Sequence, residues 1–236
     1  MKKDTEYYNK EGYIYSQKRY PEKDTDFSHL FFKKRRSILT KMIGRIVDGK
    51  ANITLLEIGC ADGVILRWTK DNFKNIIRLV GVDISDTMIK EATRIDKNHE
   101  MEFYLKEANS SFGDFDIVVE VGVLNLTDFQ KEFLFAKKHM KAGGYYICSF
   151  ASNTSMLSTM KIKKGNFQNH LKFNEYERLI RDHFSIINSE SYGIFIPYIW
   201  KIPRLARFLQ PVFEVVFKLI PNLFHERIYV LQALDS

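Results

Sequence analysis

The sequence predicts an α/β fold built on a mostly parallel sheet with helices on both faces. Three observations predict it. Short apolar segments of strand length alternate with segments of helical period, and one of them, residues 115–121 (FDIVVEV), is apolar enough to be buried on both faces. The chain has 236 residues, which is long enough for one such domain with a substantial core. On such sheets, ligands bind at the carboxyl ends of the strands, where the strand order reverses.

The first part of the chain combines an arm with a long helix. Residues 1–25 carry five tyrosines among charged residues and predict a partly ordered arm. An apolar helical period begins at Asp26 and runs to Val47, and Gly49 is a plausible stop. We expect the basic run Lys33–Arg36 on the opposite, solvent-facing side of this helix.

This front end is also basic. Residues 1–50 contain 13 Lys and Arg against 7 Asp and Glu, and the whole chain has a formal net charge of +7. Such an excess indicates contact with nucleic acid, an anionic membrane or a phosphorylated substrate, with a solvated helix face as the alternative. We therefore divide the chain into a cap over residues 1–49, made of the arm and the basic helix, and a main domain over residues 50–236.

Strands and helices alternate after this helix. The expected elements are a strand at 54–58, a helix from about Asp62, strands at 79–82, 101–105 and 115–121, helices at 87–97 and 129–141, and strands at 145–150, 185–192 and 227–234. Gly143 and Gly144 are expected to close the helix before the strand at 145. Residues 151–172 are polar and irregular, and Asn174 can cap the late helix that follows them.

The segment LLEIGCADG, residues 55–63, lies where the first strand turns into the first helix. Gly59 lets the backbone turn sharply, and Cys60 and Ala61 are small enough for a ligand to lie close. The backbone amides near Gly63, at the helix start, point toward that ligand. The segment therefore predicts a ligand site at this turn, with Cys60 as a small spacer.

The same segment also indicates the charge of the ligand. It does not match the pattern G-x-G-x-x-G that holds a pyrophosphate, because Ala61 and Val64 stand at the second and third glycine positions. Glu57 and Asp62 would repel a pyrophosphate. A cationic or zwitterionic ligand fits these two carboxylates better.

Residues 57–63 (EIGCADG) resemble the first motif, E-x-G-x-x-x-G, of the class I S-adenosylmethionine (SAM) methyltransferases. Residues 80–85 (VGVDIS) resemble the second motif, with Asp83 at a strand end 24 residues after Gly59. The resemblance covers about residues 50–190. It implies a Rossmann-like sheet with an antiparallel last strand, methyltransferase activity and SAM as the cofactor.

The resemblance also implies cofactor contacts. Asp83 would accept hydrogen bonds from both ribose hydroxyls, and Ile84 would pack on the adenine. Glu107 and Ala108 stand where the family often has Asp-Ala near the adenine amine, so Glu107 departs from the pattern. The arm of related enzymes closes over the cofactor, and its tyrosines or arginines meet the methionine carboxylate. The full set of expected cofactor-binding residues is Glu57, Gly59, Cys60, Ala61, Gly63, Asp83, Ile84, Glu107, Ala108, Val121 and Tyr20, with Tyr15 and Arg19 as further arm candidates.

Catalytic residues are harder to predict from sequence than cofactor contacts, because methyl transfer from a sulfonium depends mainly on alignment of the acceptor and exclusion of water. A base is required only when the acceptor must lose a proton. Residues 123–126 read VLNL, where many small-molecule members have V-L-E-H and enzymes acting on DNA amino groups have D/N-P-P-Y. We expect Asn125 to orient the substrate or the methionine moiety. His170, His225 and Glu226 are the candidate catalytic residues, and we expect no metal ion.

The insertion between the last two strands, residues 192–226, is rich in apolar and aromatic residues. Prolines at positions 203 and 211 predict two short helices, over 203–209 and 211–220. Lys201, Arg204 and Arg207 flank the first helix. These features indicate contact with a membrane surface or a lipid tail. A dimer interface, a lid packed on the core, and an apolar substrate pocket are the alternatives.

The sequence therefore predicts a SAM-dependent methyltransferase acting on a small or lipid-linked acceptor, at an oxygen atom of a glycan or isoprenoid-type precursor. In layout it is similar to ubiquinone/menaquinone-type and sugar methyltransferases. The alternatives are a nucleic-acid methyltransferase, which we do not favour, and a catalytically silent partner protein. Two isolated cysteines and no apparent signal peptide or membrane-spanning run predict a cytoplasmic protein. The apolar insertion with its basic flank adds the expectation that the protein is peripheral at the inner membrane face.

Overall fold

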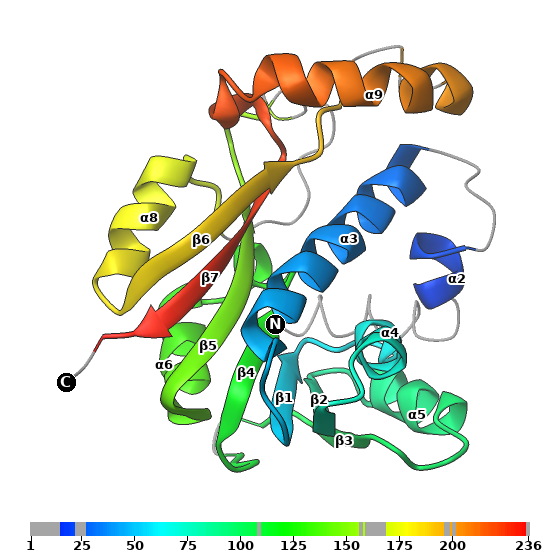
Figure 1. Cartoon of the computed structure of the whole chain (residues 1–236), viewed down its shortest axis with the longest axis vertical. Coiled ribbons are helices and arrows are strands. Elements are labelled where there is room, and N and C mark those ends of the chain that lie inside the picture. The colour runs from blue at the N-terminus through cyan, green and yellow to red at the C-terminus, as the bar shows by residue number, and fades with distance from the viewer. Residues whose placement is uncertain are drawn as a thin grey trace.

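A computed structural model of the chain describes residues 15–21, 27–107, 110–155, 158, 169–195, 199 and 202–234. Within these residues, one sheet forms the centre of the molecule and helices cover both of its faces (Figure 1). Helices α3, α4 and α5 pack on one face, and helices α6 and α8 pack on the other. The expected α/β fold is confirmed.

The described strands form a seven-stranded sheet in the order β3-β2-β1-β4-β5-β7-β6. The strands are β1 Ile53–Ile58, β2 Ile76–Asp83, β3 Glu102–Leu105, β4 Phe115–Glu120, β5 Met140–Ala151, β6 Phe184–Tyr192 and β7 Glu226–Ala233. Only β7 runs against its neighbours, because it pairs antiparallel with both β5 and β6. This confirms the mostly parallel sheet with an antiparallel last strand. The strand order reverses between β1 and β4, so ligand binding is expected at their carboxyl ends.

Most of the expected helices are present, with ends that differ by a few residues. The helices are α2 Tyr15–Arg19, α3 Phe27–Val47, α4 Val64–Asn72, α5 Asp86–Ile95, α6 Phe129–Lys138, α8 Phe173–Arg181 and α9 Pro203–Phe217, with short 3-10 helices η2 Leu124–Leu126 and η4 Pro221–Leu223. Side chains cap two of them in the usual way, since Ser85 accepts from the Met88 amide at the start of α5 and Asp128 from the Lys131 amide at the start of α6.

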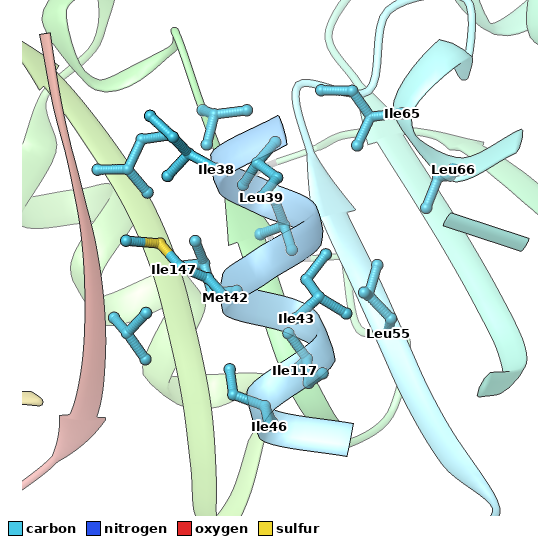
Figure 2. Close-up of a cluster of buried hydrophobic side chains, with 14 of the residues drawn as sticks. Ile38, Leu39, Met42, Ile43, Ile46, Leu55, Ile65, Leu66, Ile117 and Ile147 are labelled. Carbon is cyan, nitrogen blue, oxygen red and sulfur yellow. The ribbon is translucent and has the colours of Figure 1, made fainter. Parts of the chain in front are cut away.

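Helix α3 forms much of the core on its side of the sheet (Figure 2). Its apolar residues recur every three or four positions and are buried against strand residues such as Leu55, Ile117 and Ile147. In β4, Ile117 belongs to this cluster and Val118 to the cluster on the other face. The strand FDIVVEV is therefore buried on both faces, as its composition predicts.

Arg35 corrects one expectation about this helix. The sequence placed the whole basic run of α3 on the solvent side, but Arg35 is only 7% exposed, while Lys33 is exposed. Arg35 lies four residues after Phe31 and three before Ile38, and both of these are buried. The helical period therefore puts Arg35 on the buried face of α3.

Two other expectations about element ends are wrong. Helix α9 is one helix that continues through Pro211, where two helices were expected. Pro211 has no N–H to donate to the carbonyl of Arg207, but both residues are exposed, so water can satisfy that carbonyl. Strand β5 begins at Met140 and contains Gly143 and Gly144. A Cβ at Gly144 would lie within 3.2 Å of two β4 backbone oxygens, so glycine lets the strands approach.

No helix among the described residues is both long enough and apolar enough to cross a membrane.

Candidate functional site

The turn between β1 and α4 is held in a conformation that depends on its small residues. The φ angles of Gly59, Ala61 and Gly63 are 72°, 48° and 77°, in the left-handed region that favours glycine. The Gly59 amide donates to the Val82 carbonyl over 2.8 Å, which fixes the turn to β2. A Cβ on Gly59 would lie 2.3 Å from Val123 Cγ2, so the loop after β4 also requires glycine here.

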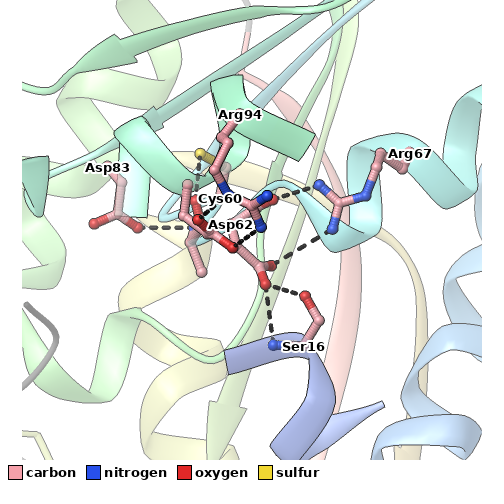
Figure 3. Close-up of polar contacts among 8 residues, drawn as sticks. Ser16, Cys60, Asp62, Arg67, Asp83 and Arg94 are labelled. Atoms are coloured by element: carbon pink, nitrogen blue, oxygen red, sulfur yellow. Dashed lines mark hydrogen bonds and ion pairs between the residues drawn. The ribbon is translucent and has the colours of Figure 1, made fainter. Parts of the chain in front are cut away.

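Asp83 ends β2 directly beside this turn and is 8% exposed. Its Oδ2 accepts a hydrogen bond from the Ala61 amide over 2.9 Å (Figure 3). Its Oδ1 accepts one from the Ser85 amide, also over 2.9 Å. Burial raises the pKa of Asp83, although these amides oppose the rise. Each carboxylate oxygen keeps a further acceptor position. Asp83 can therefore hold the turn and still accept hydrogen bonds from a ligand.

Three carboxyl groups, those of Glu57, Asp62 and Asp83, are gathered and buried at this turn. Glu57 Oε2 is buried and has no hydrogen-bond partner among the residues that the structure describes. Burial, followed by the charges of Asp83 and Asp62, raises the pKa of Glu57 well above its usual value, while Arg67 opposes the rise. A cation that donates a hydrogen bond to Glu57 would give Oε2 a partner and would offset the repulsion among the three carboxylates. The turn is therefore suited to a positively charged group.

Cys60 has no sign of chemical activation. It is 2% exposed, and burial raises the pKa of its thiol well above the usual value, with Asp83 and Glu57 adding to the rise. A thiol that stays protonated is a poor nucleophile. A Cβ on Gly81 of β2 would lie 2.8 Å from Cys60 Sγ, so the cysteine fills the space between the turn and this strand. This geometry agrees with a spacer role.

Asp62 connects the turn to the N-terminal arm (Figure 3). Its Oδ2 accepts hydrogen bonds from the Ser16 amide, over 3.0 Å, and from the Ser16 hydroxyl. The Arg67 guanidinium donates to the Asp62 carbonyl and lies 3.8 Å from its carboxylate. Helix α2 is therefore held against the β1–α4 turn, where the arm was expected to close.

The expected arm residues lie near this turn. The Arg19 guanidinium is 4.2 Å from the centre of the Tyr15 ring. The Tyr20 ring centre is 5.4 Å from that of Phe32, and burial raises the pKa of Tyr20. Arg35 lowers this pKa and Glu57 raises it, so Tyr20 lies near both charged groups. The arm thus supplies aromatic and hydroxyl groups next to the acidic turn.

A buried ion pair at the other side of the site was missed at the sequence level. Arg35 Nη2 donates to Glu226 Oε2 over 2.6 Å, and Arg35 Nε donates to the Tyr192 hydroxyl over 2.8 Å. Burial raises the pKa of Glu226, but Arg35 and Ser149 outweigh it and the pKa falls below its usual value. The Ser149 hydroxyl also accepts from the Gly122 amide, after β4. This cluster ties α3, β6 and β7 to the strand-end loops.

His225 lies next to this pair. Its ring centre is 5.6 Å from that of Phe31 and 5.3 Å from that of Phe195. Burial lowers the pKa of His225 to about 4, so the ring is neutral at pH 7. Its Nδ1 is buried, and the described residues supply it with no hydrogen-bond partner. His170 is connected to this region through hydrogen bonds: its Nε2 lies 3.3 Å from the Ser158 hydroxyl, which also donates to the Ser152 carbonyl over 3.1 Å. The Ser152 amide in turn donates to the His225 carbonyl over 2.9 Å. The loop that carries His170 is therefore fastened to the start of β7, where His225 and Glu226 lie.

Asn125 is used differently from the expectation. Its Nδ2 donates to the carbonyls of Ala151 and Asn169 and to the Tyr176 hydroxyl, over 2.9–3.1 Å. Its Oδ1 accepts from the Ala151 amide over 2.7 Å. Because these bonds occupy its donors, the side chain fastens the loop after β4 to β5 and α8. This geometry does not support the expectation that Asn125 orients a substrate directly.

Glu120, at the end of β4, is another buried acid, and the sequence did not single it out. It accepts a hydrogen bond from the Tyr146 hydroxyl over 2.5 Å, and its Oε1 has no partner within the described part of the chain. Burial, then the nearby Glu132 carboxylate, raises the pKa of Glu120 to about 8. Lys106 forms an ion pair with Glu132 beside it. Glu120 lies on the same face of β4 as Val118, away from α3.

The remaining expected ligand contacts lie around the strand ends. Ile84 is 37% exposed directly after Asp83, Val121 is 8% exposed after β4, and Glu107 is exposed after β3. Ala108 falls outside the described residues. In the part of the chain that the structure describes, no group of three His, Cys, Asp or Glu side chains is placed to hold a metal ion.

The chain is similar to known methyltransferases. A family model described as a methyltransferase domain matches residues 31–193, which is more than half of the chain. No protein of curated function matches it by sequence. Magnesium protoporphyrin IX methyltransferase from Synechocystis, with bound S-adenosylhomocysteine, is a similar structure, with 15% identity, a TM-score of 0.68 and 99% of each chain covered.

Two further structures have the same fold. The N-methyltransferase NodS of Bradyrhizobium japonicum, in complex with S-adenosylhomocysteine, is 13% identical with a TM-score of 0.63, over 99% of this chain and 98% of that one. A chain in the complex of the Haloferax volcanii Trm112 methyltransferase activator with a methyltransferase is 17% identical with a TM-score of 0.61, over 86% of this chain and 95% of that one. At these identities the likeness shows the fold alone.

Proposed function

This chain belongs to the methyltransferase domain family, and on that premise we propose that it transfers a methyl group from SAM to a small or lipid-linked acceptor. The acceptor atom we propose is an oxygen of a glycan or an isoprenoid-type precursor, and the place of the reaction is the cytoplasmic surface of a membrane. Two of the similar structures, a porphyrin methyltransferase and NodS, contain S-adenosylhomocysteine, and another structure of the first contains SAM. They support SAM as the methyl donor.

The observation that carries this proposal is the buried Oε2 of Glu57, which has no hydrogen-bond partner in the described part of the chain and lies within a cluster of three carboxyl groups. SAM carries two cationic groups, a sulfonium and an ammonium, close together. An ammonium group donating to Glu57 Oε2 would satisfy the orphaned oxygen and offset the repulsion from Asp62 and Asp83. A nucleotide pyrophosphate would be repelled by the same three groups.

The proposed cofactor contacts follow from this placement. Asp83 would accept the ribose hydroxyls with the acceptor positions that the Ala61 and Ser85 amides leave open. Ile84, exposed beside it, would cover the adenine, and Tyr20 would cover the methionine end. The proposed set is Glu57, Gly59, Cys60, Ala61, Gly63, Asp83, Ile84, Glu107, Ala108, Val121 and Tyr20.

The bound cofactor supplies the electrophilic methyl group, and the chain's residues align the acceptor with it. We assign this role to His225, because its neutral ring presents a buried Nδ1 that can accept a hydrogen bond from an acceptor hydroxyl. With a pKa of about 4, His225 is better suited to orientation than to removing a proton. His170, near it, is the proposed proton acceptor, and the Arg35–Glu226 pair holds the position of His225.

Calorimetry with SAM tests the cofactor site. Glu57→Gln keeps the size of the side chain and removes its charge, so it should weaken SAM binding at least tenfold, since hydrogen bonds to charged groups contribute about 1.5–3 kcal/mol. Glu190→Gln is the matched control, because Glu190 is a partly exposed acid on β6, paired with Lys41. Unchanged SAM affinity in Glu57→Gln would mean that the Glu57 carboxylate does not bind the cofactor, which would contradict the proposal.

Transfer of labelled methyl groups tests the acceptor. The purified protein is offered SAM together with lipid extracts, glycans or RNA. Transfer to lipid extracts or glycans is the expected result. Transfer to RNA alone would favour the nucleic-acid alternative, and SAM binding without any transfer would favour the silent partner protein.

A further inference from the structure

Helix α9 lies across the end of the molecule toward which the parallel strands point (Figure 1). Its inner face is attached to the rest of the protein: Ala206 is 3% exposed, and Phe217 packs against the core cluster on the α6 and α8 side. Glu214 accepts from Lys34 of α3 over 2.8 Å and from Gln210 over 3.1 Å. The inner face is therefore already occupied, and it fixes which side of α9 points outward.

The outer face of α9 is apolar and open. Its large side chains follow each other at spacings of three and four residues, which puts them in one stripe along the helix. Their exposed fractions range from 40% to 86%. They are Leu205, Phe208, Val212, Val215, Val216 and, in the turn just past the end of the helix, Leu219, and together they form the outer stripe. An exposed apolar surface of this extent marks an interaction site.

Basic residues border the outer stripe on one side. At 100° per residue, Arg204, Arg207 and Lys218 fall together between the stripe and the inner face, and all three are exposed. The sequence of α9 contains one acid, Glu214, which is turned toward Lys34 with its side chain 18% exposed. The outward side of this helix is therefore apolar and positively charged.

The basic border beside the apolar stripe favours an anionic lipid surface over a second copy of the chain as the partner of α9. A second copy that pairs stripe against stripe with its helix antiparallel would bring Arg204 and Arg207 of one helix beside Lys218 of the other, with no outward acid of α9 to neutralise them. An anionic lipid surface supplies the opposite charge to the basic border and an apolar interior to the stripe. Since no described helix can cross a membrane, α9 would lie in the plane of the interface.

We propose that the outer stripe and basic border of α9 form a docking surface for a bilayer that contains anionic phospholipid. This inference deepens the proposed function, on which it rests for the membrane location, by naming the surface that makes the contact. Docking through α9 would turn the carboxyl ends of the parallel strands toward the side from which a lipid-linked acceptor arrives (Figure 1). Asp83 ends β2, and His225 directly precedes β7, whose first residue pairs with the end of β5, so both residues lie at that end of the sheet.

The test is co-sedimentation with phosphatidylcholine vesicles, with and without phosphatidylglycerol, at low and at physiological salt. The wild-type chain should sediment with the anionic vesicles and be released as salt rises. The charge variant Arg204→Gln/Arg207→Gln/Lys218→Gln should bind about 100-fold more weakly, because each basic residue near an anionic surface contributes about fivefold. The control Lys74→Gln/Lys97→Gln/Lys131→Gln makes the same charge change at exposed positions elsewhere and should bind nearly as wild type.

A second variant separates apolar insertion from charge attraction. Phe208→Ser/Leu219→Ser keeps every charge and should still lose about tenfold or more of vesicle binding, since each large side chain loses its burial. Equal binding by this variant, or a wild-type chain that ignores anionic vesicles, overturns the proposal. A wild-type dimer in light scattering that becomes monomeric in this variant also overturns it, in favour of a second copy. SAM affinity is measured separately, so a protein that does not bind vesicles can still bind SAM as proposed.

Discussion

Arg35 Nη2 and Glu226 Oε2 lie 2.6 Å apart, although 191 residues separate them in the sequence. Both side chains are almost fully buried, at 9% and 4% exposure. Arg35 also donates to the Tyr192 hydroxyl, so one guanidinium joins the first long helix to both of the last two strands. Next to this pair in the sequence is His225, whose Nδ1 is buried and has no hydrogen-bond partner among the described residues. The pair therefore fastens α3 to β6 and β7 beside the residue that we propose for acceptor binding.

Removing one charge of this pair should destabilise the fold. Glu226→Gln leaves a buried guanidinium uncompensated, which costs about 3–5 kcal/mol of unfolding free energy in urea denaturation. Replacing both partners, in Arg35→Met/Glu226→Met, should recover most of this loss, since no buried charge remains. Glu190→Gln, which breaks a more exposed pair with Lys41, should cost about 1 kcal/mol or less. If Glu226→Gln also lowered the unfolding free energy by about 1 kcal/mol or less, the prediction that Arg35 depends on Glu226 as its buried counter-charge would be wrong.

Glu57→Gln should raise the stability of the cofactor-free protein. The pKa of Glu57 in the folded state is raised well above its usual 4.5, so the folded state loses stability as the pH rises from that value toward the raised pKa. An uncharged side chain removes this penalty at neutral pH. Thermal unfolding should show a higher Tm for the variant without SAM and a smaller increase in Tm on adding SAM. A lower Tm without SAM would mean that the Glu57 carboxylate is stabilised in the folded chain.

Asp83→Ala should weaken SAM binding about tenfold or more, because two ribose hydroxyls lose an acceptor and each charged hydrogen bond contributes about 1.5–3 kcal/mol. The control is Asp86→Ala, which removes a more exposed carboxylate three residues later, paired with Lys90. Circular dichroism checks that the β1–α4 turn, which Asp83 also holds, survives. Calorimetry that gives equal affinities for the two variants would exclude Asp83 from the cofactor site.

Glu120 should make the stability of the protein depend on pH. Its pKa in the folded state is raised from 4.5 to about 8, so its contribution is fully present below pH 4.5 and is lost as the pH rises through about 8. The loss should be on the order of 5 kcal/mol, since each unit of pKa difference corresponds to about 1.4 kcal/mol. In Glu120→Gln, which keeps a partner for the Tyr146 hydroxyl, this part of the decline should disappear. The measurement is urea denaturation from pH 5 to pH 9, and parallel curves for the two proteins would contradict the prediction.

The order of strands and helices was predictable because it depends on local patterns. The apolar run at 115–121 is sufficient to indicate a strand buried on both faces, and the three- and four-residue spacing of α3 indicates its core face. The small residues of the β1–α4 turn and the acid at the end of β2 are equally local. These signals placed Gly59 and Asp83 at one end of the sheet, and the structure brings them together.

The remaining features depend on partners that are distant in the sequence. The burial of Arg35 follows from the helical period, but its partner Glu226 becomes visible only once β7 lies beside β6. Asn125 occupies the position of a family acid, and its bonds to Ala151 and Tyr176 come from other elements. Pro211 predicted a helix end, yet α9 is held on both sides of it by inner-face contacts. Such tertiary contacts override local preference.

Strand β7 is the last strand of the sheet to be synthesised, and in the folded protein it lies between β5 and β6. Among the described strands, β6 pairs with β7 alone. A nascent chain that has not yet reached Glu226 therefore presents the long edge of β5 and a strand with no neighbour, both open to pairing with other chains. It also lacks the counter-charge for Arg35. Folding of this half of the sheet must wait for the last strand, and a stalled or truncated chain would depend on chaperones to avoid aggregation.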